Sequence, residues 1–235
     1  MKRKNRILNA AMVLLLIAAL VCGGLLVHEY RKNAGMDAAA DGLQAEKPEG
    51  EDSMDFAALR AENPEIIAWL TIPGTTIDYP VLQAADNKYY LSHDAQKKLN
   101  KNGALFLDYR MRADFSDFNS VIYGHYMSSG MMFQNLVKFK EKDFFESHDE
   151  VVFYTPEQTR ELEIVAVAVV PSSSPLYNYI FTSPSEQEAH LQLLKEKAKY
   201  YRGADFAPDD RLVLLSTCSY EYTEARTIVA CRLPA

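Results

Sequence analysis

The chain has 235 residues with a formal net charge of −7 at pH 7, and 48% of its residues are hydrophobic. This apolar content can build a substantial core, which excludes a disordered protein. Residues 1–27 carry a charge of +4, which leaves −11 on the remainder, and such an acidic chain without a basic stripe argues against a nucleic-acid partner.

The first predicted element is an apolar segment, residues 7–27, which contains no charged side chain. A helix of this length can cross a hydrocarbon core of about 30 Å. Four basic residues precede it, so we expect residues 1–6 to form a cytoplasmic tail and the rest to lie outside the cell. A cleaved signal peptide is the alternative, but the apolar segment is long for one and no A-x-A cleavage site follows it.

Residues 28–52 are polar and rich in Ala, Gly and Glu, a composition that predicts a flexible stalk. The remaining residues, 53–235, are expected to form one globular domain, which starts with a short helix over 55–62. Residues 131–140 and 142–148 are predicted to form two further short helices.

Short runs rich in Val, Ile, Leu and Tyr dominate this domain, and Gly, Pro, Asp or Asn residues bound them. Eight such runs predict a mostly β fold, an eight-stranded closed or nearly closed barrel. The predicted strands are 66–72, 77–82, 104–109, 120–123, 151–154, 161–170, 211–217 and 227–233.

A longer helix is predicted over residues 184–202, inserted before strand 211–217. Ser183 and Glu186 have the spacing of a capping box, Pro184 suits the first turn, and Gly203 can end the helix. The predicted apolar stripe consists of Leu191, Leu194, Ala198 and Tyr201.

Cys218 ends the run Arg-Leu-Val-Leu-Leu-Ser-Thr-Cys, so its thiol is expected at the mouth of a barrel strand, where it can meet a substrate. Two alternatives remain open: a buried small apolar residue, and a disulfide with Cys231. The third cysteine, Cys22, lies in the apolar N-terminal segment.

His125 follows strand 120–123, and Gly124 leaves room beside it. We expect it at a barrel end, with a structural histidine as the alternative. The other histidines are expected to be solvated; they are His28, His93, His148 and His190.

Arg226 opens the last predicted strand, eight residues after Cys218. If the last two strands form a hairpin, the cysteine and the arginine lie close together. A guanidinium there can stabilise a developing oxyanion. The alternative is a surface ion pair with Glu221 or Glu224.

The segment Leu214-Leu-Ser-Thr-Cys218 resembles the Thr-Leu-x-Thr-Cys signature of sortases, the transpeptidases that attach surface proteins to Gram-positive cell walls. Tyr-Gly-His125 and Arg226 are similar to the family's catalytic histidine and arginine, and the resemblance covers residues 55–235. The class B sortases are the most similar class. The segments that resemble class B are 69–81, 86–91, 103–109, 123–133 and the helix at 184–202. Leu214 departs from the signature threonine, and Ser219 stands where some class B members carry an acid.

The resemblance implies that Cys218 attacks a threonine carbonyl in a C-terminal sorting signal and forms a thioacyl-enzyme. It implies that His125 protonates the leaving amine and later deprotonates the incoming one, and that Arg226 holds the substrate oxygen. The residues implied to bind the substrate are Asn87, Leu91, Tyr179, Ile180 and Ser216. The implied partners are surface proteins with sorting signals and an amine of a cell-wall precursor or pilin, with no cofactor.

Some readings stay open. A thiol protease would use the same cysteine and histidine but release the acyl group to water, and a membrane-anchored binding module would not react at all. Asp108 could orient the histidine or form an ion pair with Arg110. No metal-ligand spacing is present, although Asp108, Asp114 and Asp117 could bind Ca²⁺ loosely.

Overall fold

The computed structural model of the protein describes residues 12, 15–27, 54–203 and 205–235. The chain divides into two compact units, one of residues 1–42 and one of residues 43–235.

In the first unit, residues 15–27 are helical and their side chains are exposed. Within the part of the chain that the structure describes, no helix is both long enough and apolar enough to cross a membrane. The predicted tail 1–6, the predicted stalk 28–52 and most of residues 7–14 of the predicted anchor lie outside the described residues.

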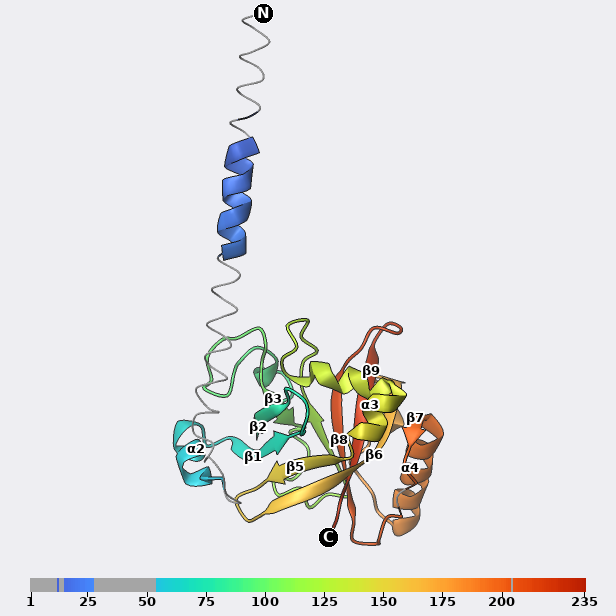
Figure 1. Ribbon diagram of the computed structural model, residues 1–235. Coiled ribbons are helices and arrows are strands. Elements are labelled where there is room, and N and C mark those ends of the chain that lie inside the picture. Colours follow the sequence, from blue (N-terminus) through green and yellow to red (C-terminus); the bar gives the residue numbers. More distant parts are fainter. Residues whose placement is uncertain (1–11, 13–14, 28–53, 204) are drawn as a thin grey trace, which may run out of the picture. The chain divides into compact units, whose positions relative to one another are not determined.

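The second unit is built on one β-sheet that closes into a barrel (Figure 1). Its strands are β1 (Ile66–Thr71), β2 (Asp78–Leu82), β3 (Leu105–Leu107), β4 (Asn119–Tyr123), β5 (Glu150–Tyr154), β6 (Thr159–Pro171), β7 (Ala198–Tyr201), β8 (Arg211–Cys218) and β9 (Ala225–Leu233). They pair in the order β5-β1-β2-β3-β4-β8-β9-β6-β7, and β5 also pairs with β6. This extra pairing closes eight of the described strands into a ring, and β7 adds to β6 beside it. The predicted mostly β, eight-stranded barrel is confirmed.

The strand β8 passes through the middle of the core. Its six residues from Leu212 to Thr217 are all buried. A strand with one face exposed to solvent would instead alternate between buried and exposed side chains. The 3-10 helix η2 (Phe133–Lys140) packs against β8 and β9 and covers one face of these two strands. Because both faces of β8 are covered, its sequence reads as an almost continuous apolar run.

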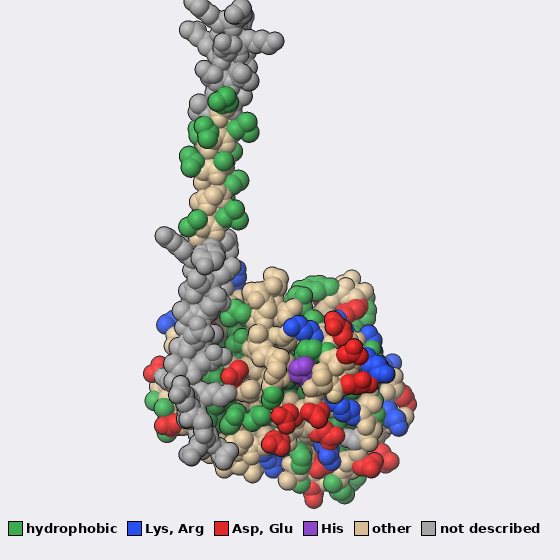
Figure 2. Space-filling model, in the orientation of Figure 1, with side chains coloured by type: hydrophobic (Ala, Val, Ile, Leu, Met, Phe, Trp, Pro, Cys, Tyr) green, Lys and Arg blue, Asp and Glu red, His purple; other side chains and the backbone are tan. Residues whose placement is uncertain are grey.

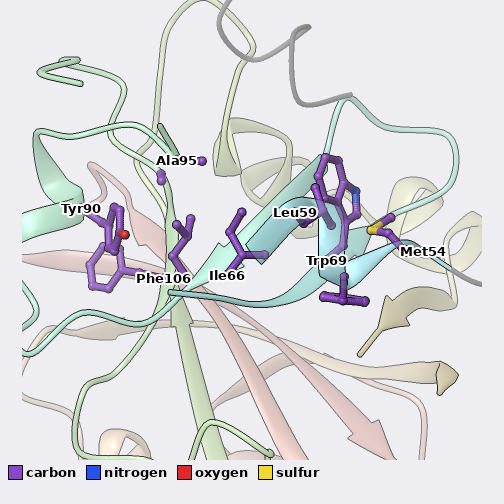
Figure 3. Close-up of a cluster of buried hydrophobic side chains, with 10 residues drawn as sticks. Met54, Leu59, Ile66, Trp69, Tyr90, Ala95 and Phe106 are labelled. Atoms are coloured by element: carbon purple, nitrogen blue, oxygen red, sulfur yellow. The ribbon is translucent and has the colours of Figure 1, made fainter. Parts of the chain in front are cut away.

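The helix α2 (Phe56–Glu62) fastens the start of the domain to the barrel. The Asp55 carboxylate caps it by accepting hydrogen bonds from the backbone N–H groups of Ala57 and Ala58, both at 3.0 Å. Leu59 of this helix packs in a buried cluster with Trp69 of β1 (Figure 3). The predicted helix over 55–62 is therefore confirmed, with Asp55 as its cap.

The two short helices after β4 differ in kind. The segment predicted as a helix over 131–140 is the 3-10 helix η2, which begins at Phe133. The second is the α-helix α3 (Lys142–Ser147), within the predicted 142–148. A further 3-10 turn, η3 (Pro175–Tyr177), follows β6, and η1 (Tyr89–Leu91) follows β2.

The prediction of one helix over 184–202 is wrong at its C-terminal end. The helix α4 (Pro184–Lys197) starts as predicted, with Ser183 accepting from the Glu186 N–H at 3.3 Å, but it stops before Ala198. The next four residues form β7, in which Tyr200 and Tyr201 pair with β6. Backbone pairing to an open stretch of β6 outweighs helix periodicity here, since tyrosine favours strands. Gly203 thus follows a strand and does not end the helix.

The apolar stripe predicted for this helix is wrong as well. The buried side chains of α4 are Leu194, which belongs to that stripe, and His190, which does not. Ala198 and Tyr201 lie on β7, so they cannot continue a helical face.

Candidate active site

The ends of three strands meet at one rim of the barrel. β4 runs parallel to β8, with Tyr123 opposite Ser216, and the Gly124 N–H donates to the Ser216 carbonyl at 3.1 Å. His125 therefore leaves β4 at the level where Cys218 ends β8. β9 runs antiparallel to β8 and places Arg226 directly opposite Cys218. The three predicted catalytic residues line one pocket of about 380 Å³.

Two glycines, Gly103 and Gly124, allow close packing near His125. A Cβ atom at Gly124 would come within 2.4 Å of Leu105 Cδ2 and 2.7 Å of Phe133 Cδ2. Gly103 has a φ of +61°, and a Cβ there would lie 2.3 Å from a backbone oxygen and 3.1 Å from His125 Cδ2. Gly103 therefore provides the room beside His125, whereas Gly124, which was expected to provide it, makes room for Leu105 and Phe133.

The imidazole of His125 has one fixed partner. Its Nε2 lies 2.8 Å from the backbone oxygen of Leu91. A carbonyl oxygen can only accept a hydrogen bond, so this contact requires the proton on Nε2. In the neutral ring Nδ1 is then left free to take up a proton.

The two cysteines of the barrel have different environments. Cys218 is half-buried at the pocket, whereas Cys231 is fully buried in β9 opposite Val213. Burial raises the pKa of the Cys231 thiol, so that thiol stays protonated and unreactive. Both are free thiols, so the alternative of a disulfide between them is wrong.

The Arg226 guanidinium lies between the pocket and the β8–β9 loop. Its Nη1 donates to the Ala225 carbonyl at 2.9 Å, and its Nη2 lies 3.4 Å from a carboxylate oxygen of Glu224. Glu221 instead pairs with Lys140. The predicted ion pair with Glu224 therefore exists, and Arg226 lines the pocket at the same time.

The five predicted substrate-binding residues divide between two neighbouring hollows. Asn87, Leu91 and Ser216 line the same pocket as Cys218. Tyr179 and Ile180 line an adjacent groove of about 860 Å³ instead. The two hollows share three lining residues, which are Ser172, Tyr123 and Tyr177.

Two tyrosines between these hollows were not predicted. The Tyr177 hydroxyl lies 2.8 Å from Ser216 Oγ, and burial raises the Tyr177 pKa to about 12. The Tyr123 ring stacks on that of Tyr177 with centroids 6.2 Å apart. The sequence places Tyr123 close to His125, because Tyr123 is the last residue of β4 and lies two residues before the histidine. Tyr177 sits in a loop turn that the sequence does not place near Ser216.

Asp108 serves as an anchor for the pocket wall. Its buried carboxylate accepts from Arg110 Nε at 2.9 Å and Nη2 at 2.7 Å, and from the Tyr123 hydroxyl at 3.2 Å. Burial would raise the pKa of this carboxyl, but the hydrogen bonds from Arg110 outweigh it and leave the pKa lowered. Of the two predicted roles of Asp108, the ion pair with Arg110 is found, and among the described residues no hydrogen bond joins its carboxylate to His125.

The remaining histidines are less exposed than predicted. His190 is buried on α4 against Phe118 and Phe181, so its predicted solvation is wrong. His93 stacks on Tyr89, and His148 stacks on Phe144. His28 lies outside the described residues. In the described ranges, no three His, Cys, Asp or Glu side chains gather in a way that could hold a metal ion.

Acidic and basic side chains are interspersed on the face of the barrel unit that Figure 2 shows, without a continuous basic band.

The sequence and the fold both match known proteins. The sortase domain family matches residues 70–234. Sortase B of Listeria monocytogenes is 34% identical over 186 residues, which cover 78% of this chain and 76% of that protein. Sortase B of Staphylococcus aureus is 26% identical over 242 residues and covers 98% of both chains.

Among solved structures, a class B sortase of Streptococcus pyogenes involved in pilus biogenesis superposes with a TM-score of 0.69. It is 34% identical, and the match covers 76% of this chain and 97% of that one. With a family domain over most of the barrel and class B enzymes as its relatives, the chain belongs to the sortase family of cysteine transpeptidases, in class B.

Proposed function

We propose that this protein is a membrane-anchored transpeptidase that cleaves a C-terminal sorting signal after threonine and transfers the acyl group to an amine of a cell-wall precursor or pilin. The observation that carries the proposal is the convergence of Cys218, His125 and Arg226 on one pocket, from three neighbouring strand ends. A nucleophile, a proton carrier and an oxyanion donor are the three groups that acyl transfer through a thioester needs.

In the first half-reaction, the Cys218 thiolate attacks the threonine carbonyl carbon and forms a C–S bond. Arg226 donates hydrogen bonds to the oxyanion of the tetrahedral intermediate. When that intermediate collapses, the C–N bond breaks and His125 gives a proton to the departing amine. The products are a thioacyl-enzyme and the released C-terminal peptide.

In the second half-reaction, His125 takes a proton from the incoming amine, whose nitrogen attacks the thioester carbon. The C–S bond breaks, a new amide forms, and the thiolate of Cys218 is regenerated. The Leu91 carbonyl supports this role, because it holds the imidazole by Nε2 and leaves Nδ1 for the transferred proton.

The substrate contacts are also part of the proposal. Asn87, Leu91 and Ser216 contact the sorting signal beside the cleaved bond, and Tyr179 and Ile180 contact residues farther along the groove. The pilus role of the Streptococcus pyogenes relative supports pilin as one possible class of acceptor, alongside cell-wall precursors.

The test is a peptide-library screen with the full chain in detergent and hydroxylamine as the amine. We expect a hydroxamate product at threonine and a thioacyl adduct on Cys218, both detected by mass spectrometry. Cys218→Ala should abolish both, and Arg226→Ala should lower turnover by about 100-fold or more. Cys22→Ala is the matched control, because it removes a thiol outside the barrel.

Each other reading predicts a different result. A thiol protease would also give some hydroxamate, because hydroxylamine attacks any thioester, but with a glycine peptide as the only amine it would release mainly the free acid. A binding module would give neither product, and Cys218 would not react. Retained transfer in Cys218→Ala would end the assignment.

A further inference from the structure

The β8–β9 loop, residues 219–224, joins the strand of Cys218 to the strand of Arg226 and is held from three sides. The Tyr220 ring meets the Tyr126 ring edge-on at 5.4 Å. Glu221 forms an ion pair with Lys140. Glu224, at the other end of the loop, contacts the end of β6. Of these residues, Glu224 also contacts Arg226, one of the proposed catalytic residues.

The backbone of Glu224 has an unusual conformation. Its φ is +62°, in the left-handed region that glycine and asparagine favour and that a glutamate seldom adopts. The surrounding hydrogen bonds hold it there, because the Ser172 N–H donates to the Glu224 carbonyl at 2.9 Å. A side chain kept at a strained position beside an active site points to a function for that side chain.

The Glu224 carboxylate links two residues that line the pocket. Its Oε2 accepts from Ser172 Oγ at 3.0 Å and from Arg226 Nη2 at 3.4 Å. The Arg226 Nη1 is held in turn by the Ala225 carbonyl at 2.9 Å. Both terminal nitrogens of the guanidinium are therefore tied on the side of the loop. Each terminal nitrogen keeps a second N–H, and the Nε–H makes no hydrogen bond to any described residue, so these donors remain available to a ligand.

We propose that Glu224 is a positioning residue that fixes the Arg226 guanidinium for the substrate oxygen before the substrate arrives. This inference rests on the proposed role of Arg226. An arginine side chain has large rotamer freedom, and the tether removes that freedom in the free enzyme. Donors that are already oriented stabilise the transition state without reorganisation, so the tether acts on kcat more than on KM.

The experiment measures kcat and KM of the full chain with the library-selected peptide and hydroxylamine. Glu224→Ala should lower kcat about fivefold, which is the scale of one partly exposed ion pair, while KM changes less than twofold. Glu224→Gln keeps an acceptor oxygen and the same backbone strain, so it should retain more than half of the wild-type kcat. Thermal unfolding of each variant checks that the barrel is intact.

The double variant separates positioning from a structural role. If Glu224 acts through Arg226, then Glu224→Ala should have no further effect in an Arg226→Ala background. Equal loss in both backgrounds would overturn the inference, and so would a faster Glu224→Ala, because that would mean the carboxylate competes with the substrate.

Two further outcomes keep the proposals distinct. Glu221→Ala removes the other loop carboxylate that forms an ion pair and should change kcat less than twofold; a loss equal to that of Glu224→Ala would overturn the inference. If Arg226→Ala retained full activity, the proposed role of Arg226 would fail. If Arg226→Ala were strongly impaired and Glu224→Ala lowered kcat by the same factor in that background as in the wild type, only the proposed role of Glu224 would fail.

Discussion

His190 lies on α4, and its imidazole packs among aromatic rings. The centroid of the imidazole is 5.0 Å from the centroid of the Phe181 ring and 6.2 Å from that of the Phe118 ring. Burial lowers its pKa from 6.5 to about 4, and its Nε2 has no hydrogen-bond partner among the described residues. A neutral imidazole suits this position, and a protonated one does not. This side chain therefore links the stability of the barrel to pH.

We predict that His190 destabilises the folded chain in mild acid. The unfolded chain binds a proton near pH 6.5 and the folded chain only near pH 4, so the free energy of unfolding falls as the pH drops through this window. The full loss is roughly 3 kcal/mol. Urea unfolding at pH 7 and pH 4.5 should show a smaller difference for His190→Phe than for the wild type. His93→Phe, whose ring is half-buried on Tyr89, is the control, and identical pH dependence of both variants would contradict this prediction.

At the scale of single residues, the sequence predicted which side chains share the pocket better than it predicted their hydrogen-bond partners. Cys218, His125 and Arg226 were recognisable because each follows or opens an apolar strand beside a family motif. The pair of Arg226 with Glu224 was expected only as an alternative, and the contact of His125 with the Leu91 carbonyl was not expected, because η1 lies in a loop region far from His125 in the sequence. Only long-range packing decides where such loops lie.

The end of β4 is the element on which the position of His125 depends. A methyl group at Gly124 would collide with Leu105 and with the ring of Phe133, both of which are buried and cannot move aside cheaply. The strand end must then shift, and His125 shifts with it.

We therefore predict that Gly124→Ala lowers kcat/KM at least tenfold and costs about 1–3 kcal/mol of stability. Steady-state transfer rates and urea unfolding measure the two effects. Gly130→Asn is the control, since a Cβ there meets nothing within 4 Å and asparagine tolerates its φ of +91° better than other side chains. Full activity in Gly124→Ala would show that β4 can adjust without moving the histidine.

The elements themselves were largely predictable, with one physical exception. All eight predicted runs are strands, because turn residues bound each of them and their apolar content fits a closed sheet. The ninth strand, β7, was read as the end of a helix, since Ala198 and Tyr201 continue the helical spacing of α4. Pairing with β6 overrides that local pattern, and no short-range feature of the sequence reports such pairing.

At the scale of the whole molecule, we predict that residues 7–27 hold the protein in a membrane. The protein should sediment with membranes and resist extraction by alkaline carbonate, yet dissolve in detergent. Protease added to intact cells should digest the barrel, because the basic residues before the anchor keep residues 1–6 inside. Release by carbonate, or protection of the barrel from protease, would contradict the anchor or its orientation.

The order of the strands in the barrel has a consequence for biosynthesis. The strand that leads into His125 is flanked by β3 and by β8, and β8 and β9 follow the other seven described strands in the sequence. A growing polypeptide can therefore form much of the sheet before Cys218 of β8 and Arg226 of β9 have been added. Pairing over such sequence distances is slow, so we expect the newly made enzyme to stay inactive until β8 and β9 dock.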